Sequence, residues 1–338
     1  HRPSEADLVT RRSSLKKKYA AIDDRDEQAQ PLPPVAAFEP PTDRLAPPPT
    51  APPLEGWPLA PEQAKALQAK CGLPPKKLDL GQGVSLELMP IPSGRFVMGQ
   101  AGAFDDEGPP CIASVDQPFY IARLEVTNAQ YARFDPLHDS GYIEARGKDR
   151  FTRGTPVNEP DQPVVRVSWR RAIAFCRWLS EKTGQHVSLP TEAQWEWACR
   201  AGTDGAFCFE YKPGVNSVGN FADGGLAGWN YGRGESGYSD GARYSVAGGK
   251  YPPNAWGLCD MHGNVAEWTL SAYRPYPYVA RDGRNDPTKD ELRVVRGGSW
   301  NDTLGFSRSA SRWRYPAYQP VYNVGFRVVV QPGELVQR

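Results

Sequence analysis

The side chains best suited to redox or metal chemistry in this chain are its few cysteines and histidines. The cysteines are Cys71, Cys111, Cys176, Cys199, Cys208 and Cys259, and the histidines are His1, His138, His186 and His262. There is no CxxC pair and no histidine at ligand spacing from a cysteine, so the pattern predicts no zinc site. Free cysteines are commonly buried, so we expect buried thiols, with one disulfide in an oxidising compartment as the alternative.

Acid–base chemistry has no recognisable pattern either. His262 stands alone in the turn "DMHGNVAEW", where a lone histidine is more often structural than catalytic. Glu192, Glu196 and Glu267 have no evident acid or base partner. No glycine-rich loop follows a strand in the way that phosphate binding requires. The residue types therefore predict no catalytic centre.

Local patterns predict the elements that would position these residues. Three helices are expected after the N-cap residues Thr127, Ser168 and Thr191, and the first and third carry Gln three residues later, as in a capping box. The stretch "VSLELMPIPSGRFVMGQ" from Val84 alternates, turns at "PSG" and resumes, which predicts a hairpin. Residues 203–265 show little regular structure, so they need an ion, a dense hydrogen-bond network or a binding role.

Composition divides the chain into three parts. Residues 1–30 form a charged tail, and residues 31–83 form a Pro- and Ala-rich arm or linker with a short helix at about 60–71. The folded domain is predicted over 84–331. The residues that would anchor the arm, if it packs, are Phe38 and Trp57.

Charge and hydropathy exclude several classes of function. The chain has 40 Lys and Arg against 39 Asp and Glu, which argues against nucleic-acid binding and general attraction to membrane surfaces. With 34 Pro and 33 Gly, the composition suits a loop-rich fold. No apolar run reaches the length of a membrane span and no targeting segment is visible, so a cytoplasmic location is slightly favoured over surface display.

Six ordered motifs carry a resemblance to a known family. They are "EVTNAQYARF", "PVVRVSWRRAIAFCRWLS", "LPTEAQWEWACRAG", "NAWGLCDMHGNVAEW", "RVVRGGSW" and "NVGFRVV". Together they resemble the formylglycine-generating-enzyme, or sulfatase-modifying-factor, family. The resemblance implies an α+β, C-type lectin-like fold of the formylglycine-generating-enzyme type, with short twisted antiparallel sheets, about two to three helices and long ordered loops.

The oxidase chemistry of that family requires two cysteines, five residues apart, that bind copper just after the "GGS" motif. Soft thiolates hold Cu(I), and no other side chain replaces them simply. Residues 299–327 contain no cysteine, and the last one in the chain is Cys259. We therefore expect no copper and no formylglycine-generating activity. Iron-dependent sulfoxide-synthase relatives need a His-rich site that is also missing, while a cysteine-independent oxidoreductase stays open.

The C-terminal segment resembles another branch, the variable proteins of diversity-generating retroelements. Those proteins end in "RGGSW", a diversified stretch, "RSA-R" and a closing "GFR" strand, which here are 296–300, 307–312 and 325–327. The resemblance places a variable region at about 297–327. In those systems adenines of Asn-type codons are randomised, and Trp313 and Gln319 cannot be reached from such codons. These two need other template codons or count against the interpretation.

The predicted ligand-binding residues are Asn301, Asp302, Thr303, Leu304, Gly305, Phe306, Trp313, Tyr315, Ala317, Tyr318, Gln319, Val321 and Tyr322. Aromatic residues supply rigid contact area and small polar residues adapt their hydrogen bonds, a mixture typical of paratopes. Buried strands on both sides would hold the frame while this stretch varies. Such a broad surface favours a protein or other macromolecule over a small metabolite. The alternative is that Trp313, Tyr315 and Tyr318 are ordinary second-layer aromatics.

The resemblance also implies two structural calcium sites that would order the 203–265 loops. The ligands of the first are Asn220, the Phe221 carbonyl, Asp240 and the Ala242 carbonyl. Those of the second are Asp260, the Gly263 and Val265 carbonyls, and Glu267. Calcium takes six to eight hard oxygen ligands, many of them carbonyls. The alternative is that these side chains only hydrogen-bond loop backbone.

The leading interpretation is a non-enzymatic protein that displays a diversified ligand-binding surface on a C-type lectin-like scaffold. The alternative is a cysteine-independent metal enzyme or oxidoreductase of the same superfamily. A structural subunit of a larger complex is suggested only by the Pro-rich arm.

Overall fold

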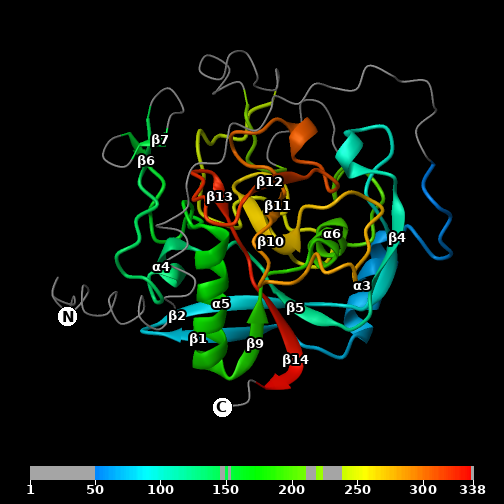
Figure 1. The fold of residues 1–338 in the computed structure, drawn as a ribbon, viewed down its shortest axis with the longest axis horizontal. Coiled ribbons are helices and arrows are strands. Elements are labelled where there is room, and N and C mark those ends of the chain that lie inside the picture. Colours follow the sequence, from blue (N-terminus) through cyan, green and yellow to red (C-terminus); the bar gives the residue numbers. More distant parts are fainter. Residues whose placement is uncertain (1–49, 145–148, 151–153, 211–217, 224–237, 336–338) are drawn as a thin grey trace.

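The computed structural model describes residues 50–144, 149–150, 154–210, 218–223 and 238–335. Its largest sheet has five antiparallel strands in the order β1-β2-β5-β14-β9, along the lower part of Figure 1. These strands are β1 (Lys76–Gly81), β2 (Val84–Ile91), β5 (Phe119–Ala122), β9 (Gln185–Ser188) and β14 (Val329–Leu335).

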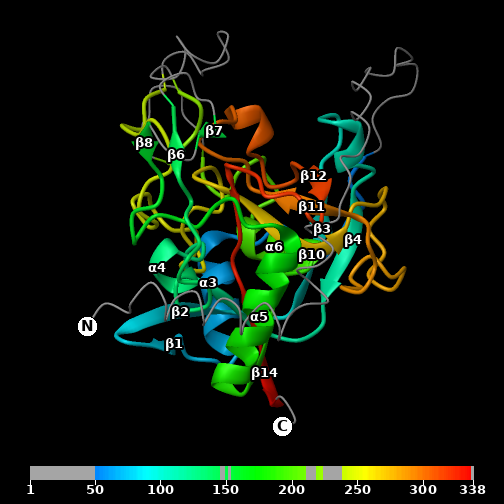
Figure 2. The same cartoon turned by 60° about the vertical axis from the view of Figure 1, so that its left-hand side comes forward.

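A second sheet, in the order β12-β11-β10-β13, lies above the first in both views (Figures 1 and 2). Its strands are β10 (Ala266–Ala272), β11 (Leu292–Arg296), β12 (Trp313–Pro316) and β13 (Val324–Gly325). β13 runs parallel to β10, and the other neighbours are antiparallel. Two small sheets add β3 (Gly94–Met98) with β4 (Cys111–Val115), and β6 (Tyr142–Ile143) with β7 (Asp149–Arg150) and β8 (Thr155–Pro156).

Three of the described helices begin directly after the predicted N-cap residues. The described helices are α3 (Pro61–Lys70), α4 (Asn128–Tyr131), α5 (Trp169–Thr183) and α6 (Glu192–Arg200), with short 3₁₀ turns η1 (Asp105–Glu107) and η2 (Leu304–Phe306). The side chains of Thr127, Ser168 and Thr191 each accept the amide N–H three residues on. The three predicted helix starts and the α+β, C-type lectin-like fold class are confirmed. The described part of the domain holds the three helices expected there, and α3 is the short helix expected in the arm.

The predicted hairpin from Val84 is wrong. β2 pairs with β1 on one side and with β5 on the other, whereas β3 pairs with β4 in a separate sheet. Because both edges of β2 are occupied, no edge is left for β3. The chain instead leaves the large sheet after β2, and β3 starts the small sheet with β4.

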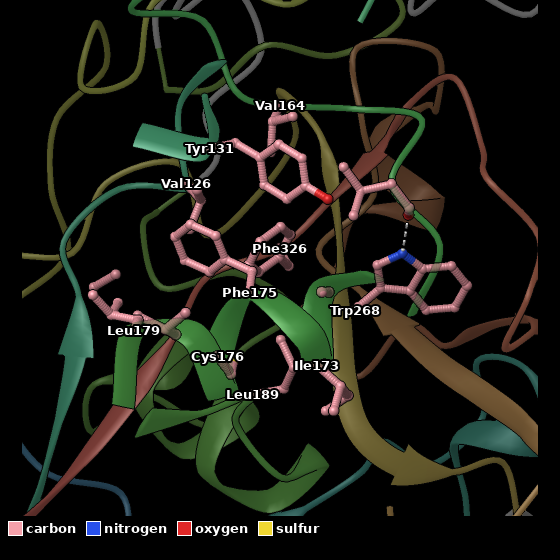
Figure 3. Close-up of a cluster of buried hydrophobic side chains, with 14 of the residues drawn as sticks. Val126, Tyr131, Val164, Ile173, Phe175, Cys176, Leu179, Leu189, Trp268 and Phe326 are labelled. Atoms are coloured by element: carbon pink, nitrogen blue, oxygen red, sulfur yellow. Dashed lines mark hydrogen bonds between the residues drawn. The ribbon is translucent and has the colours of Figure 1, made fainter. Parts of the chain in front are cut away.

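The main core lies between α5 and the two large sheets (Figure 3). Phe175 of α5 stacks on Tyr131 with ring centres 5.6 Å apart and meets Phe326 edge-on at 5.4 Å. Trp268 of β10 donates its indole N–H to the Val167 carbonyl at 2.9 Å. The core therefore packs residues from the first half of the domain, such as Tyr131 and Phe175, against residues from its second half, such as Trp268 and Phe326. This packing holds β10 in place.

The arm packs onto the domain from residue 50 onward. Trp57 lies against Trp197 of α6, with ring centres 5.7 Å apart, and the Leu59 N–H donates to the Gly202 carbonyl at 2.9 Å. Helix α3 corresponds to the helix expected at about 60–71, and its Ala64 carbonyl accepts the Trp256 indole N–H at 3.0 Å. Strand β1 also precedes the expected domain start at residue 84. Phe38 lies outside the described residues.

The loops at 203–265 carry no named helix or strand where the structure describes them, apart from an isolated bridge between Asn220 and Gly263. Within the described part of the chain, no helix is both long and apolar enough to cross a membrane.

Candidate functional site

The C-terminal segment is divided by a buried hexapeptide, 307–312, which we call the anchor. Arg308 donates both terminal N–H groups to the Glu107 carboxylate at 2.6 and 2.7 Å. Arg312 donates to the Glu192 carboxylate at 2.6 and 3.2 Å. Two bidentate ion pairs therefore fix the middle of the predicted variable region to η1 and α6.

A second glutamate of α6, Glu196, holds the strand that leads into this segment. Its carboxylate accepts the Gly99 N–H and Arg200 Nε at 2.8 Å each, and also Arg296 Nη2. Arg296 donates as well to the Ser311 carbonyl at 2.7 Å. Burial disfavours the Arg296 charge, but the Glu196 carboxylate outweighs burial and raises the pKa of Arg296 above its ordinary value. The glutamates without an evident partner in the sequence are thus paired with distant arginines.

The residues on both sides of the anchor remain accessible. The predicted ligand-binding residues that are half-buried or exposed are Asn301, Asp302, Thr303, Gly305, Phe306, Trp313, Tyr315, Tyr318, Gln319 and Tyr322. We call 301–306 the first patch and 313–322 the second patch. The segment that was expected to be one irregular surface is two short surfaces separated by a fixed, buried stretch, and β12 makes part of the second patch regular.

Three predicted ligand-binding residues are buried, which corrects the prediction for them. Leu304 packs with Phe221 and Tyr238, while Ala317 and Val321 belong to the main core. The carbonyls of Ala317 and Val321 also accept backbone N–H groups from α5 and the loop before it, at 3.2 and 2.9 Å. Whether an amino acid can be reached from an Asn-type codon says nothing about its burial, so the sequence could not separate these three from their accessible neighbours.

A row of three aromatic rings joins the two patches. Phe306 stacks on Phe104 with ring centres 5.1 Å apart and meets Trp313 at 5.4 Å. Phe104 and Phe306 are 40% and 37% exposed. Phe104 comes from the loop before η1, and no local signal in the sequence placed it on this surface.

The tyrosines of the second patch have mixed roles. Tyr315 packs edge-on against buried Trp268, with ring centres 6.1 Å apart, and burial raises the pKa of Tyr315 to about 12. The Tyr322 hydroxyl accepts a hydrogen bond from Asn301 Nδ2 at 2.9 Å, which links the second patch to the first. Arg170 lies over the Tyr318 ring at 5.9 Å. The second-layer alternative therefore describes Tyr315 in part.

Asp302 of the first patch is half-buried and hydrogen-bonded to neighbouring residues. Its Oδ2 accepts the Ser299 hydroxyl at 2.6 Å, and its carbonyl accepts the Ala222 N–H at 3.0 Å. Burial disfavours the carboxylate charge and raises the pKa of Asp302 to about 6, although hydrogen bonds from Ser299 oppose the shift.

Replacing Asp302 with asparagine should make the protein more stable above pH 7. Because the folded state binds the proton more tightly than the unfolded chain, the free energy of unfolding of the parent should fall as pH rises from about 3.8 through about 6. The amide keeps an acceptor for Ser299 but does not ionise. Thermal melts at pH 4.5 and pH 8 should show a rise in Tm of a few degrees for Asp302→Asn at pH 8 only. The exposed control Asp116→Asn should show neither change, and equal effects of Asp302→Asn at both pH values would contradict the assignment.

His262 links α6, a loop and the anchor. Its Nδ1–H donates to the Ser307 carbonyl at 2.8 Å, so its Nε2 accepts the Cys208 N–H at 3.2 Å and faces the Cys199 thiol at 3.4 Å. Burial lowers the pKa of His262 to about 4 and keeps the ring neutral. These contacts give His262 the structural role expected of it. All six cysteines are free, and Cys176, Cys199 and Cys259 are fully buried.

In the first predicted calcium set, Asp240 contacts the backbone of Phe221 and Ala242. Asp240 accepts the Phe221 N–H at 2.9 Å through Oδ2 and the Ala242 N–H at 2.8 Å through Oδ1. The side-chain oxygen of Asn220 is buried and has no hydrogen-bond partner. An amide oxygen left in that state is costly unless a cation or another donor reaches it. The donor set therefore fits a hard cation.

The second predicted set is partly occupied by an internal cation. Glu267 accepts Arg327 Nη2 and Nε at 2.6 and 2.7 Å, and the Trp195 indole N–H at 2.8 Å. Asp260 Oδ2 accepts the Gly249 N–H at 2.6 Å, whereas Asp260 Oδ1 is buried without a partner. Among the described residues no three His, Cys, Asp or Glu side chains are grouped to hold a metal, so both sets would depend on amide and carbonyl oxygens.

Comparison with known proteins gives relatives and structures of related fold. The chain is 27% identical to the formylglycine-generating enzyme of Bos taurus, over 71% of this chain and 74% of that protein. It is 29% identical to the inactive C-alpha-formylglycine-generating enzyme 2 of Bos taurus, over 76% and 94%. The structure of PvdO from Pseudomonas aeruginosa is 27% identical with a TM-score of 0.60, over 77% of this chain and all of that chain.

The variable protein 1 of Treponema denticola has the same fold, with a TM-score of 0.59 at 20% identity, over 77% of this chain and 100% of that one. The model of the sulfatase-modifying factor enzyme 1-like domain matches residues 83–332, which include both large sheets and both patches. The chain therefore belongs to the sulfatase-modifying factor enzyme 1-like domain family.

Proposed function

We propose that this chain is a non-enzymatic ligand-binding protein whose C-terminal surface varies. The observation that carries the proposal is that residues 301–322 consist of a buried, fixed stretch between two accessible patches. The anchor at 307–312 is buried and ion-paired to η1 and α6, while most side chains of the two patches are accessible. A fixed frame with tolerant surfaces on both sides is the arrangement that binding loops require.

Two further observations support binding over catalysis. Residues 299–327 contain no cysteine, so the thiolate pair that would hold copper is missing. The C-alpha-formylglycine-generating enzyme 2 of Bos taurus, which is named inactive, is as similar to the chain as the formylglycine-generating enzyme is. A relative at comparable identity is therefore named as inactive, which is compatible with a non-enzymatic role.

The shape of the surface favours a macromolecular ligand. A cavity of about 280 Å³ lies between the arm and the domain, and its lining includes Trp57, Val97 and Asp204 but none of the predicted ligand-binding residues. The patches instead present aromatic rings on an open surface, of the kind that protein interfaces use.

The neighbouring DNA provides the decisive test. We expect a near-copy of the codons for 297–327 beside a reverse-transcriptase gene. The two sequences should differ only at positions where the copy has adenine. Substitutions in natural variants should then fall in the two patches and spare the anchor. If no such copy is found, the proposal that this surface is diversified is wrong.

The alternative is an enzyme that works without the cysteine pair, and the specific observation in its favour is the similarity to the formylglycine-generating enzyme. Incubation of the purified protein with copper(I), oxygen and a cysteine-containing sulfatase peptide should leave the peptide mass unchanged. Tight copper or iron binding, or turnover of a thiol or phenolic substrate, would favour the enzyme.

We also propose that the two oxygen-rich sets bind structural calcium, because each contains one buried side-chain oxygen without a partner. Adding calcium to protein stripped with a chelator should raise the free energy of unfolding by about 2.7 kcal/mol per site at a hundredfold excess over Kd. Differential scanning calorimetry with Asn220→Ala and Asp260→Ala separates the sets, since each variant should lose part of the increase. Identical melting with calcium and with chelator would contradict the proposal.

A further inference from the structure

The second patch contains an edge strand. β12 is the last strand of its sheet, and in the described part of the chain it has β11 as its single neighbour. The pair is antiparallel, with Val294 opposite Arg314, Val295 opposite Trp313 and Arg293 opposite Tyr315. An edge strand presents backbone N–H and C=O groups that another strand can bind.

The hydrogen bonds of β11 show which residues of β12 face outward. The carbonyls of Leu292 and Val294 are turned toward β10, because they accept the Tyr273 N–H at 2.7 Å and the Thr269 hydroxyl at 3.0 Å. Backbone groups alternate along a strand, so Arg293 and Val295 are turned toward β12.

Trp313 and Tyr315 therefore exchange hydrogen bonds with β11, and the N–H and C=O of Arg314 point to the open edge. No hydrogen bond to these two groups is formed within the described residues.

The side chain of Arg314 is also uncommitted to any acid. It lies over the Tyr273 ring at 4.4 Å and is half-buried, and it forms no salt bridge with a described carboxylate. Neighbouring anchor residues differ in this respect, since Arg308 and Arg312 are both ion-paired. A half-buried guanidinium on an open edge favours a ligand that brings a carboxylate.

We propose that the ligand supplies an extended peptide segment that pairs antiparallel with β12 at Arg314. The segment carries an acidic residue opposite Arg314, flanked by apolar residues that lie on the face of Trp313 and Tyr315. In an antiparallel pair one residue exchanges both backbone hydrogen bonds with the residue opposite it, which matches the free N–H and C=O of Arg314. This inference rests on the proposed binding role of the surface and specifies its ligand class as a β-strand.

Main-chain pairing has a consequence for a surface that varies. The backbone of β12 contributes hydrogen bonds whatever the side chains of the second patch are, so it gives every variant a common mode of attachment. The side chains at Trp313 and Tyr315 then determine which apolar neighbours are accepted. Affinity and specificity would thus come from different atoms of the same strand.

The test uses the full chain and a peptide enriched from a random dodecapeptide phage library, synthesised in two forms. One form is unmodified, and the other carries an N-methyl group on the amide of the acidic residue opposite Arg314. We expect the methyl group, which removes one donor and blocks the edge, to weaken binding by about tenfold or more. Hydrogen exchange of the Arg314 amide should slow when the unmodified peptide binds. Equal affinity of the two forms, or unchanged exchange at Arg314, would overturn the proposal.

Two variants separate the backbone of Arg314 from its side chain. Arg314→Ala keeps the edge N–H, so it should retain binding but lose the preference for an acidic residue. Arg314→Pro removes the N–H at a position where β11 does not need it, and proline is tolerated on an open edge. Arg314→Pro should abolish peptide binding with a Tm close to that of Arg314→Ala. Full binding by Arg314→Pro would refute strand pairing. If this variant fails to fold, the comparison of the methylated with the unmodified peptide tests strand pairing on the parent protein.

The outcomes distinguish this inference from the proposed function. If the template copy of 297–327 is found but no strand-forming peptide is enriched, the surface varies and its ligand is not an extended segment. If peptides bind at Arg314 without any template copy, strand pairing stands and diversification falls.

Discussion

Replacing Glu196 with alanine should destabilise the domain by about 3–5 kcal/mol, the usual cost of leaving a buried charge without its partner. Glu196 is fully buried, and its carboxylate accepts hydrogen bonds from the Gly99 N–H, Arg200 and Arg296 at once. The variant leaves two buried guanidinium groups short of their principal acceptor. Urea unfolding followed by tryptophan fluorescence measures the loss directly.

The matched control is Glu87→Ala. Glu87 also pairs with two cations, Lys77 at 2.9 Å and Arg123 at 3.4 Å, but its side chain is 42% exposed. Exposed ion pairs contribute little, so this variant should lose less than about 1 kcal/mol. If the two variants were equally stable, the buried contacts of Glu196 would not stabilise the domain as proposed. Glu196→Gln, which keeps the shape and one acceptor, should fall between them.

Replacing Gly298 with alanine should be a strongly destabilising change next to the first patch. Gly298 has a φ of +68°, and a Cβ there would lie 2.2 Å from the Ser307 hydroxyl oxygen and 2.9 Å from the Ser307 Cα. The strained backbone and the overlap with the anchor should together cost about 2–5 kcal/mol. Thermal melting and limited proteolysis at 307–312 should both report the loss, because the displaced residue belongs to the anchor.

Gly305→Ala is the control within the same segment. The nearest atom to a Cβ at Gly305 is the Thr303 hydroxyl at 3.9 Å, and the residue is exposed. We expect this variant to melt within a degree or two of the parent, in line with other exposed substitutions. A large loss at Gly305, or none at Gly298, would contradict the division into an anchor and patches.

Local sequence patterns predicted the parts of the fold that depend on near neighbours. The caps at Thr127, Ser168 and Thr191 act on amides three residues away, so a short window contains all the chemistry involved. The family motifs then supplied the fold class, because their order reflects one packing arrangement. Both kinds of prediction are confirmed.

Features that depend on distant contacts cannot be predicted from local sequence patterns. β2 and β3 were predicted as a hairpin because the sequence does not show that β1 and β5 already occupy both edges of β2. Phe104 and Phe306 are far apart in the sequence, and only the fold brings their rings together. The same holds for Leu304, whose burial depends on packing against Phe221. The proposed ligand contacts and calcium sites remain predictions.

The buried pairing of α6 also bears on how the chain folds as it is synthesised. Glu196 meets Arg296 one hundred residues later, and Glu192 meets Arg312 after 120 residues. Until those arginines leave the ribosome, a nascent chain that buried α6 would leave Glu192 without Arg312 and would leave Glu196 with Arg200 as its single cation. Contacts of such long range also form slowly, because their loop-closure entropy is lost first. The domain should therefore fold largely after residues 296–312 have been synthesised, and the segment that carries the proposed binding surface should be the last part to pack.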